Sequence, residues 1–217
     1  MVKLRGLMQY IPVGERLGEL FYANWMVVVS IGLLGAMEAS ITSIVAVTVA
    51  AFFVNIIWGL IDGITVMYGM IIGRVQRNSI IRRLQSGDVS AREEARRSLD
   101  DTIVSSLDEK DIDSIINLIS KTKQIPDCNG RPLHSDIAYA LGIVFLDFIM
   151  VFPLVTPLFL ISDYYAAVYV SHIISVVIFA ILGAAYAKRL NHNRWITPIM
   201  FAAMGTILAT VVYEAGW

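Results

Sequence analysis

The sequence predicts an all-helical membrane protein with five transmembrane helices and a cytoplasmic helical insert between the second and third spans. Of its 217 residues, 57% are hydrophobic and 16% are charged, whereas a soluble domain is about 45–50% apolar and about a quarter charged. The charges are also segregated: 11 of the 17 Lys and Arg residues and 10 of the 18 Asp and Glu residues lie between Arg74 and His134. The predicted parts are 1–75 (N-terminal segment and spans one and two), 76–134 (insert) and 135–217 (spans three to five).

Five apolar segments approach the roughly 20 residues that a helix needs to cross a hydrocarbon core about 30 Å thick. The first, 20–37, ends at a polar turn around Glu38. The second, 43–73, is longer than one span requires, so it is either tilted or continues beyond the bilayer into the arginines from Arg74 onward. The other three segments are 137–162, which contains Pro153 and Pro157, 164–187 and 196–213.

The distribution of basic residues predicts the orientation, because loops rich in Lys and Arg stay on the cytoplasmic side of a membrane. Such residues precede the first span, fill the insert and follow the fourth span, whereas the turns around Glu38 and Asp163 and the C-terminal tail contain none. The N-terminus and the insert are therefore predicted to be cytoplasmic and the C-terminus outside. The N-terminal residues lack the pattern of a signal peptide, which together with the small size of the chain favours a prokaryotic inner membrane.

The insert is predicted to contain two amphipathic helices. The first covers 90–106, with Ser90 as N-cap and Glu93 as its capping-box partner. The second covers 109–121, where isoleucines recur at the spacing of one helix face. Pairs of carboxylates one heptad apart form an acidic face that would gather divalent cations through oxygen ligands; they are Glu93, Glu94, Asp100 and Asp101. The alternative is a solvated helix whose acidic residues are balanced by neighbouring arginines.

Two aspartates inside the predicted spans, Asp62 and Asp147, are the clearest candidates for a functional role. A charge at the centre of a bilayer costs at least ~2.5 kcal/mol, so an ionisable residue there is a functional candidate by default. Asn55 lies two turns before Asp62 on the same helix face, and Gly59 with Gly63 forms a small-xxx-small pair that permits close helix contact. Asp62 is therefore expected either on an ion path or in a hydrogen bond that fixes helix packing.

Other residues in the spans have two interpretations each. Asp147 lies six residues before Pro153, and a proline in a helix frees backbone carbonyls, so this segment is either a hard-cation site or an ordinary kinked helix. Met67 and Met70 share a helix face and either offer soft sulfur ligands or contribute to packing. His172, in the middle of the fourth span, is either a packed histidine or a ligand.

Several classes of function find little support in the sequence. The net charge of −1, with no basic stripe separate from acidic residues, gives no indication of nucleic-acid binding. The single Cys128 excludes an internal disulfide and a multi-cysteine metal site. No HExxH, P-loop, GxSxG or CxxC motif is present, so an enzyme is not expected. An enzyme acting on lipid would have to combine Asp62 or Asp147 with His172.

Three segments occur in an order known from one family of membrane transporters. From Glu15 the chain reads ERLGELFYANWMVVVSIGLLG, the third span contains VFPLVTPLFL, and the last two spans include ILGAAYAKRLNHNRWITPIMFAAMGTILATVVYEAG. In this order the segments resemble the vacuolar iron transporter family, whose members move ferrous iron and often manganese out of the cytosol. Asn24 matches the asparagine of the family's opening motif, whereas Trp25 takes the place of the metal-binding aspartate that follows it.

The resemblance implies a homodimer of five-span subunits, with an ion path at the subunit interface and a metal-binding cytoplasmic insert. The leading hypothesis is a transporter that moves Fe2+ or Mn2+ out of the cytoplasm, with proton exchange as one coupling mode and without a tightly bound cofactor. Its path residues would be Asn24, Asn55, Asp62, Asp147, Met67 and Met70, and its metal ligands Asp62, Glu93, Glu94, Asp100 and Asp101. The alternative hypothesis is a non-transporting scaffold or regulatory protein on the same fold, in which Trp25 closes the path.

Overall fold

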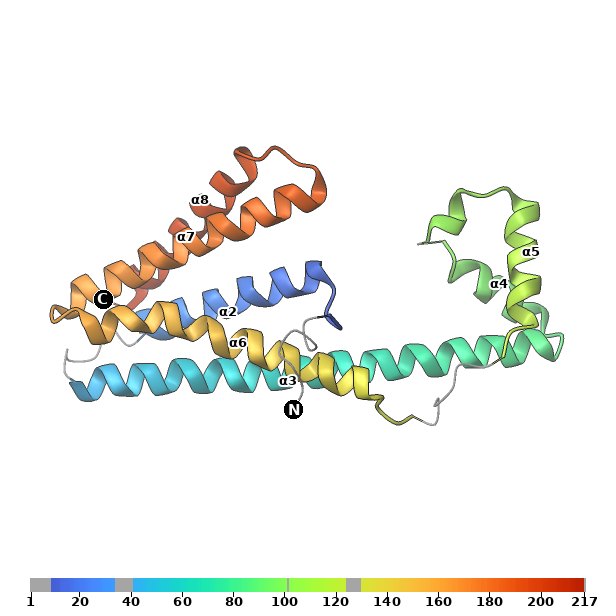
Figure 1. The fold of residues 1–217 in the computed structure, drawn as a ribbon, viewed down its shortest axis with the longest axis horizontal. Coiled ribbons are helices and arrows are strands. Elements are labelled where there is room, and N and C mark those ends of the chain that lie inside the picture. Colours follow the sequence, from blue (N-terminus) through green and yellow to red (C-terminus); the bar gives the residue numbers. More distant parts are fainter. Residues whose placement is uncertain (1–8, 34–40, 101, 124–129, 217) are drawn as a thin grey trace. The chain divides into compact units, whose positions relative to one another are not determined.

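The structure, a computed structural model, describes residues 9–33, 41–100, 102–123 and 130–216 of the chain. All regular secondary structure within these ranges is helical (Figure 1). The elements in order are α2 (Val13–Leu33), α3 (Ile41–Gln85), α4 (Val89–Arg97), the 3-10 helix η1 (Ile103–Ser106), α5 (Glu109–Ser120), α6 (His134–Leu160), α7 (Tyr164–Leu190) and α8 (Ile196–Gly216). Glu38, Asp101 and Cys128 lie outside the described residues.

Among the described residues, three helices are long and apolar enough to cross a membrane, namely α6, α7 and the part of α3 from Thr42 to Gln85. The prediction of an all-helical fold is confirmed for the described residues, and three of the predicted spans have the length and composition that crossing a membrane requires. α8 contains a shorter apolar stretch, Ile196–Val212. α3 has 45 residues, which corresponds to roughly 65 Å of helix, about twice the thickness of a hydrocarbon core. The second predicted span therefore continues as a helix through the arginines that follow it.

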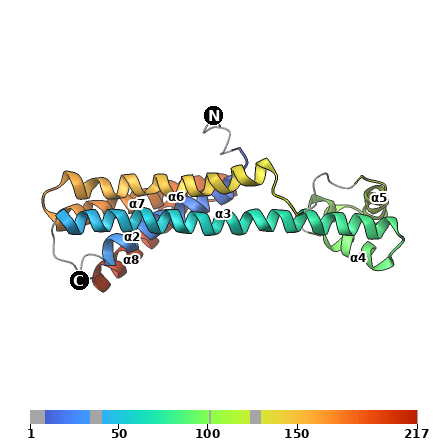
Figure 2. The same cartoon turned by 90° about the horizontal axis from the view of Figure 1, so that it is seen from below.

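The chain forms two compact units. Unit 1 consists of Met1–Thr65 and Ile137–Trp217, and unit 2 consists of Val66–Asp136. α3 contributes its first part to unit 1 and its last part to unit 2. Within unit 1, α6 runs alongside the first part of α3 in both ribbon views (Figures 1 and 2).

The core of unit 1 lies where α2, α3, α6 and α7 meet. Alanines and branched aliphatic residues dominate it, because small side chains allow membrane helices to approach one another closely. Pro153 and Pro157 lie inside α6 without ending it. The buried residues of this core are Ala23, Val27 and Ile31 of α2, Val47 and Ala51 of α3, Met150, Val151, Leu154, Val155 and Leu158 of α6, and Tyr164, Ala167 and Val168 of α7.

Unit 2 contains the end of α3 together with α4, η1 and α5. Asp88, not the predicted Ser90, is the N-cap of α4, because its side chain accepts a hydrogen bond from the backbone N–H of Ser90. The prediction of one helix over 90–106 is also wrong, since α4 ends at Arg97 and a separate 3-10 helix begins at Ile103. Ile103 is 90% exposed, so the buried apolar face of α4 does not continue to this residue. The second predicted helix is confirmed by α5.

A buried ion pair joins α3 to the start of α6 within unit 2. The guanidinium of Arg74 donates to both carboxyl oxygens of Asp136, at 2.8 and 2.5 Å. Asp136 also accepts a hydrogen bond from the backbone N–H of Leu133. The two charged side chains are only 11% and 2% exposed, and their two-pronged pairing compensates both charges away from water.

Candidate cation site

Two glycines of α3 let α6 approach closely in unit 1. A Cβ atom on Gly59 would lie 2.9 Å from Asp147 Oδ2 and from the Cα of Val144, and one on Gly63 would lie 2.8 Å from the carbonyl oxygen of Ala140. Real Cβ atoms essentially never make contacts this short, so a larger residue would force the helices apart. The close helix contact predicted from the spacing of Gly59 and Gly63 is confirmed.

Asp147 lies on α6 at this contact and is almost fully buried, with 1% of its surface exposed. Among the described residues, no group donates a hydrogen bond to either of its carboxyl oxygens. A buried acceptor without a partner costs about 1–3 kcal/mol, and more when it is charged. The carboxyl group therefore requires a partner that the surrounding side chains do not supply, such as a proton, a water molecule or a cation.

Two further acidic residues interact with Asp147 from neighbouring helices. Glu19 on α2 is 9% exposed, and its carboxyl group lies within hydrogen-bonding reach of Asp62 on α3. Asp62 is half-buried. Electrostatic interactions connect Asp147 to both of these residues and connect Glu19 to Glu15. Three carboxyl groups from three different helices thus share one region of unit 1.

Glu19 lies one residue before the first predicted span, 20–37, so hydropathy alone does not mark it as a candidate. A signal for it exists in the spacing of α2. Glu19 stands four residues before Ala23, which stands four residues before Val27, and all three are buried. Residues spaced by four lie on the same face of a helix. The position of Glu19 on the buried face could therefore have been inferred from this periodicity.

Two asparagines add neutral oxygens to the interior of unit 1. Asn55 is fully buried on α3, and its amide group donates to the carbonyl oxygen of Ala51 at 2.9 Å. Asn24 is fully buried on α2 and donates to the carbonyl oxygen of Ser175 on α7 at 3.3 Å. Neither side-chain oxygen accepts a hydrogen bond, and the hydroxyl of Ser175 also has no partner among the described residues.

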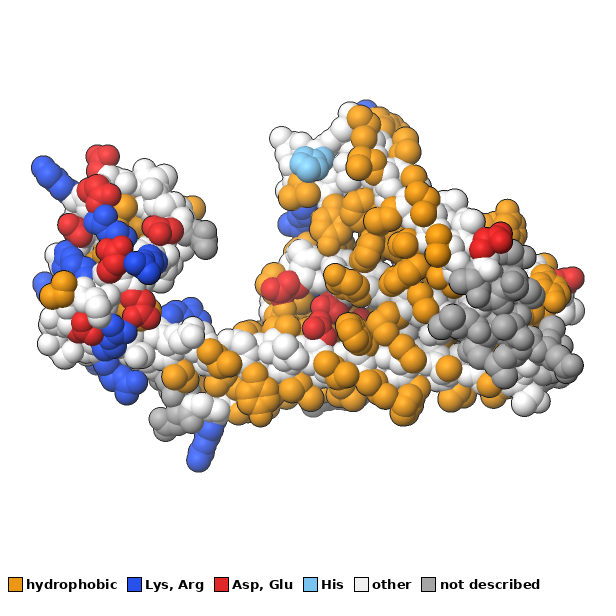
Figure 3. Space-filling view, turned by 180° about the vertical axis from the view of Figure 1, so that it is seen from behind, with side chains coloured by type: hydrophobic (Ala, Val, Ile, Leu, Met, Phe, Trp, Pro, Cys, Tyr) orange, Lys and Arg blue, Asp and Glu red, His pale blue; other side chains and the backbone are white. Residues whose placement is uncertain are grey.

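The common property of these residues is an excess of buried oxygen atoms over hydrogen-bond donors. Carboxylate and amide oxygens only accept hydrogen bonds, so they are complemented by protons, water or cations. Figure 3 shows acidic side chains at the surface of unit 1 among mainly hydrophobic ones. Within the described ranges, however, no group of three or more His, Cys, Asp or Glu residues is close enough to hold a metal ion.

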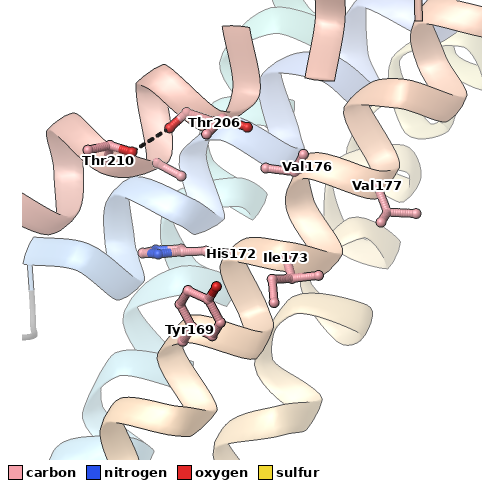
Figure 4. A pocket seen from close by; sticks show the side chains of 8 residues that line it. Tyr169, His172, Ile173, Val176, Val177, Thr206 and Thr210 are labelled. Atoms are coloured by element: carbon pink, nitrogen blue, oxygen red, sulfur yellow. Dashed lines mark hydrogen bonds between the residues drawn. The ribbon is translucent and has the colours of Figure 1, made fainter. Parts of the chain in front are cut away.

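The methionines predicted as soft ligands belong to unit 2, whereas His172 belongs to unit 1. Met67 and Met70 are half-buried residues of unit 2, whereas Asp62 and Asp147 belong to unit 1. His172 is buried on α7 and lines a cavity of about 520 Å³ with the side chains of Tyr169 and of Thr206 and Thr210 from α8 (Figure 4). The other residues that line this cavity are aliphatic, namely Ile173, Val176, Val177 and Ala209.

Arginines pair with most of the acidic residues that the structure describes in the insert. Glu94 pairs with Arg83 at 2.5 Å, and Glu93 lies 3.8 Å from Arg97. Arg96 on α4 forms an ion pair with Glu109 on α5, with a distance of 2.5 Å between their charged atoms. Asp100 is exposed. This pattern of charge pairs is the one expected of a solvated helical module, which was the alternative to a cation-gathering face.

The chain has no match among protein-family models, and none of the curated proteins matches it.

Proposed function

We propose that this protein is a cation transporter that moves a divalent ion, Mn2+ or Fe2+, out of the cytoplasm in exchange for protons. The observation that carries the proposal is the group of buried oxygens without donors on several helices of unit 1, above all both oxygens of Asp147. Packed membrane proteins avoid such groups unless they serve a purpose, because each one is costly in a bilayer. Glu19, Asp62, Asp147 and Asn55 would line the path.

The proposed arrangement in the membrane has five spans. α2 and α8 would complete the set, because α2 contributes to the same core as α3, α6 and α7 and α8 carries the apolar stretch Ile196–Val212. The N-terminus and the insert would be cytoplasmic and the C-terminus outside, in a prokaryotic inner membrane. A homodimer is part of the proposal, and lipid would cover the remaining apolar surface.

The chemistry of the proposed path favours ions that prefer oxygen. Carboxylate and amide oxygens suit Mn2+ and similar hard cations, whereas sulfur ligands suit softer metals. The acidic residues come from separate helices, so the small movements that accompany transport could bring their oxygens around an ion. Mn2+ is accordingly the first ion to test, with Fe2+ as the second.

The direct test is uptake of Mn2+ by proteoliposomes that contain a dye quenched by the ion. The wild-type protein should quench the dye faster than empty vesicles, and Asp62→Asn should abolish the difference. Asp108→Asn is the matched control, because Asp108 is an exposed carboxylate of the insert whose side chain makes no capping hydrogen bond. Equal quenching by the wild type and by empty vesicles would overturn the proposal.

A scaffold or regulatory membrane protein on the same fold is the second candidate. It is favoured by one observation, namely that the described residues contain no preformed cluster of three metal-binding side chains. Under this alternative, Asp62→Asn and Asp147→Asn would change only the stability of the protein. Neither the wild type nor these variants would transport cations.

A further inference from the structure

We infer that Ser175 and Asn24 form a second, neutral station for the transported cation, between α2 and α7. The inference rests on the proposed transport function and extends it to a residue that the sequence did not single out. The ligands would be the Ser175 hydroxyl and the Asn24 amide oxygen, and the ion would be an oxygen-preferring divalent cation such as Mn2+.

The hydroxyl of Ser175 differs from those of seven other serines and threonines in the apolar helices. A serine or threonine in such a helix usually donates to the carbonyl oxygen one turn earlier, as Ser171 does to Ala167 at 3.0 Å. Ser30, Thr48, Thr65, Thr156, Thr206 and Thr210 make the same bond. Ser175 is fully buried, and its Oγ has no hydrogen-bond partner among the described residues.

Asn24, which contacts Ser175 from α2, also has a buried oxygen without a hydrogen-bond donor among the described residues. Asn24 is fully buried, and its Nδ2 donates to the backbone oxygen of Ser175 at 3.3 Å, which leaves Oδ1 without a donor. The residues joined by this bond therefore carry two buried oxygens that nothing in the described protein satisfies. Each of them is more than nine-tenths buried, so bulk water does not replace the missing donors.

The surroundings hold these two residues firmly in place. Phe21 on α2 and Phe179 on α7 pack edge to face with their ring centres 5.0 Å apart, and each lies about one turn from the Asn24–Ser175 contact. Ala23 and Val27 of α2 and Ala167 and Val168 of α7 belong to the buried hydrophobic core of unit 1. A hydroxyl and an amide at a firm helix contact have a defined position, which is a requirement for a specific ion ligand.

A neutral station complements the carboxylates in a transport path. Conduction requires binding that is strong enough for the ion to enter and weak enough for it to leave. Asn24 lies five residues beyond Glu19 on α2, which is about 7.5 Å along the helix. Neutral oxygens there would bind a divalent ion more weakly than the carboxyl groups do, because they carry no net charge.

The test compares two buried serines one turn apart on α7. Ser175→Ala should lower the initial rate of Mn2+ uptake into proteoliposomes by roughly tenfold or more, the size of one lost contact to a charged group. Its melting temperature should stay the same or rise, because the variant removes an unsatisfied hydroxyl. Ser171→Ala, which removes a hydroxyl of similar burial with a local partner, should transport as the wild type does.

A second variant tests whether the hydroxyl touches the ion. Ser175→Cys replaces an oxygen ligand by sulfur in nearly the same volume, so it should shift the preference of transport from Mn2+ toward Cd2+. A purely structural role for Ser175 would leave this preference unchanged. Wild-type transport rates in Ser175→Ala, or equal losses of rate and melting temperature in both alanine variants, would overturn the inference.

A measurement of Mn2+ binding that does not depend on transport distinguishes a failure of this inference from a failure of the proposed function. Mn2+ should raise the melting temperature of the detergent-solubilised wild type and of Ser171→Ala, and should raise that of Ser175→Ala much less. If the wild type takes up no Mn2+ but shows this difference, the transport proposal fails and the neutral station stands. A rise that is equal in all three proteins, or absent from all, would overturn the station.

Discussion

The carboxyl group of Asp147 on α6 lies against the backbone of Gly59 on α3, with Oδ2 only 2.9 Å from the position that a Cβ atom of Gly59 would occupy. The absence of a side chain at Gly59 is therefore what admits a buried carboxyl group at this helix crossing. This relationship connects the packing of the membrane helices directly to the proposed path, because the same contact sets the spacing of the helices and positions an ionisable group.

Gly59→Ala should destabilise the protein by about 1–3 kcal/mol, the typical cost of overpacking a well-packed interior, and should also reduce transport by displacing Asp147. Gly69→Ala on the same helix is the matched control, because nothing lies within 4 Å of a Cβ atom there. That substitution should be neutral or stabilise α3 by about 0.5–1 kcal/mol. Thermal unfolding in detergent measures both. Equal stabilities of the two variants would contradict the close contact at Gly59.

Asp136→Asn should cost about 3–5 kcal/mol of stability, because it leaves the Arg74 guanidinium buried without its carboxylate. Glu93→Gln provides the comparison, since Glu93 and its partner Arg97 are 62% and 76% exposed and 3.8 Å apart. An exposed pair of this kind contributes about 0.2–1 kcal/mol. Denaturant or thermal unfolding of both variants checks the difference, and similar losses in the two would show that the Arg74 pair is not protected from water.

The pH dependence of unit 2 should reflect Asp88. Hydrogen bonds from Ser90 and Arg83 lower the pKa of Asp88 from 3.8 to about 2. A lowered pKa in the folded state stabilises the fold above the unfolded pKa, and this contribution is lost as the pH falls from 3.8 toward 2. Hydrogen exchange of the α4 amides, relative to their intrinsic rates, should therefore become faster over this range.

Asp88→Asn is the control for this effect, because asparagine also caps helices but does not titrate. In this variant the protection of the α4 amides should not change over the same pH range. Identical pH profiles for the wild type and the variant would assign the titration to another group.

Glu93→Gln combined with Glu94→Gln should leave Mn2+ uptake nearly unchanged. Both carboxylates are partially exposed and are already paired with Arg97 and Arg83, respectively, so little of their charge is available to gather ions. Initial uptake rates at a low Mn2+ concentration check this expectation. A several-fold loss would restore the interpretation of the insert as a cation-gathering face.

The sequence predicts the individual helices better than their contacts. Hydropathy located the spans now seen as α3, α6 and α7 because membrane helices require long apolar segments. The cap of α4 was misplaced, since Asp88 and Ser90 are both good N-cap residues and only the structure reveals which one accepts the backbone bond.

The site was predicted in part, for a physical reason. Asp62 and Asp147 were recognisable because charges in apolar segments are rare. Their association with Glu19 depends on the register between three helices, which is set by contacts such as Gly59 with Asp147 that one-dimensional patterns do not encode. Ser175 was inconspicuous for a similar reason, since only the structure distinguishes a hydroxyl that lacks its local bond from one that has it.

We propose that acidic residues of different helices act together on a cation, and a double-mutant cycle on Glu19 and Asp62 measures whether they do. The measurement is the initial rate of Mn2+ uptake by proteoliposomes that contain the wild type, Glu19→Gln, Asp62→Asn or both substitutions. Residues that serve one site have non-additive effects, so each single variant should abolish most of the uptake and the double variant should be no worse. Wild-type rates in either single variant, or losses that multiply in the double variant, would contradict the claim.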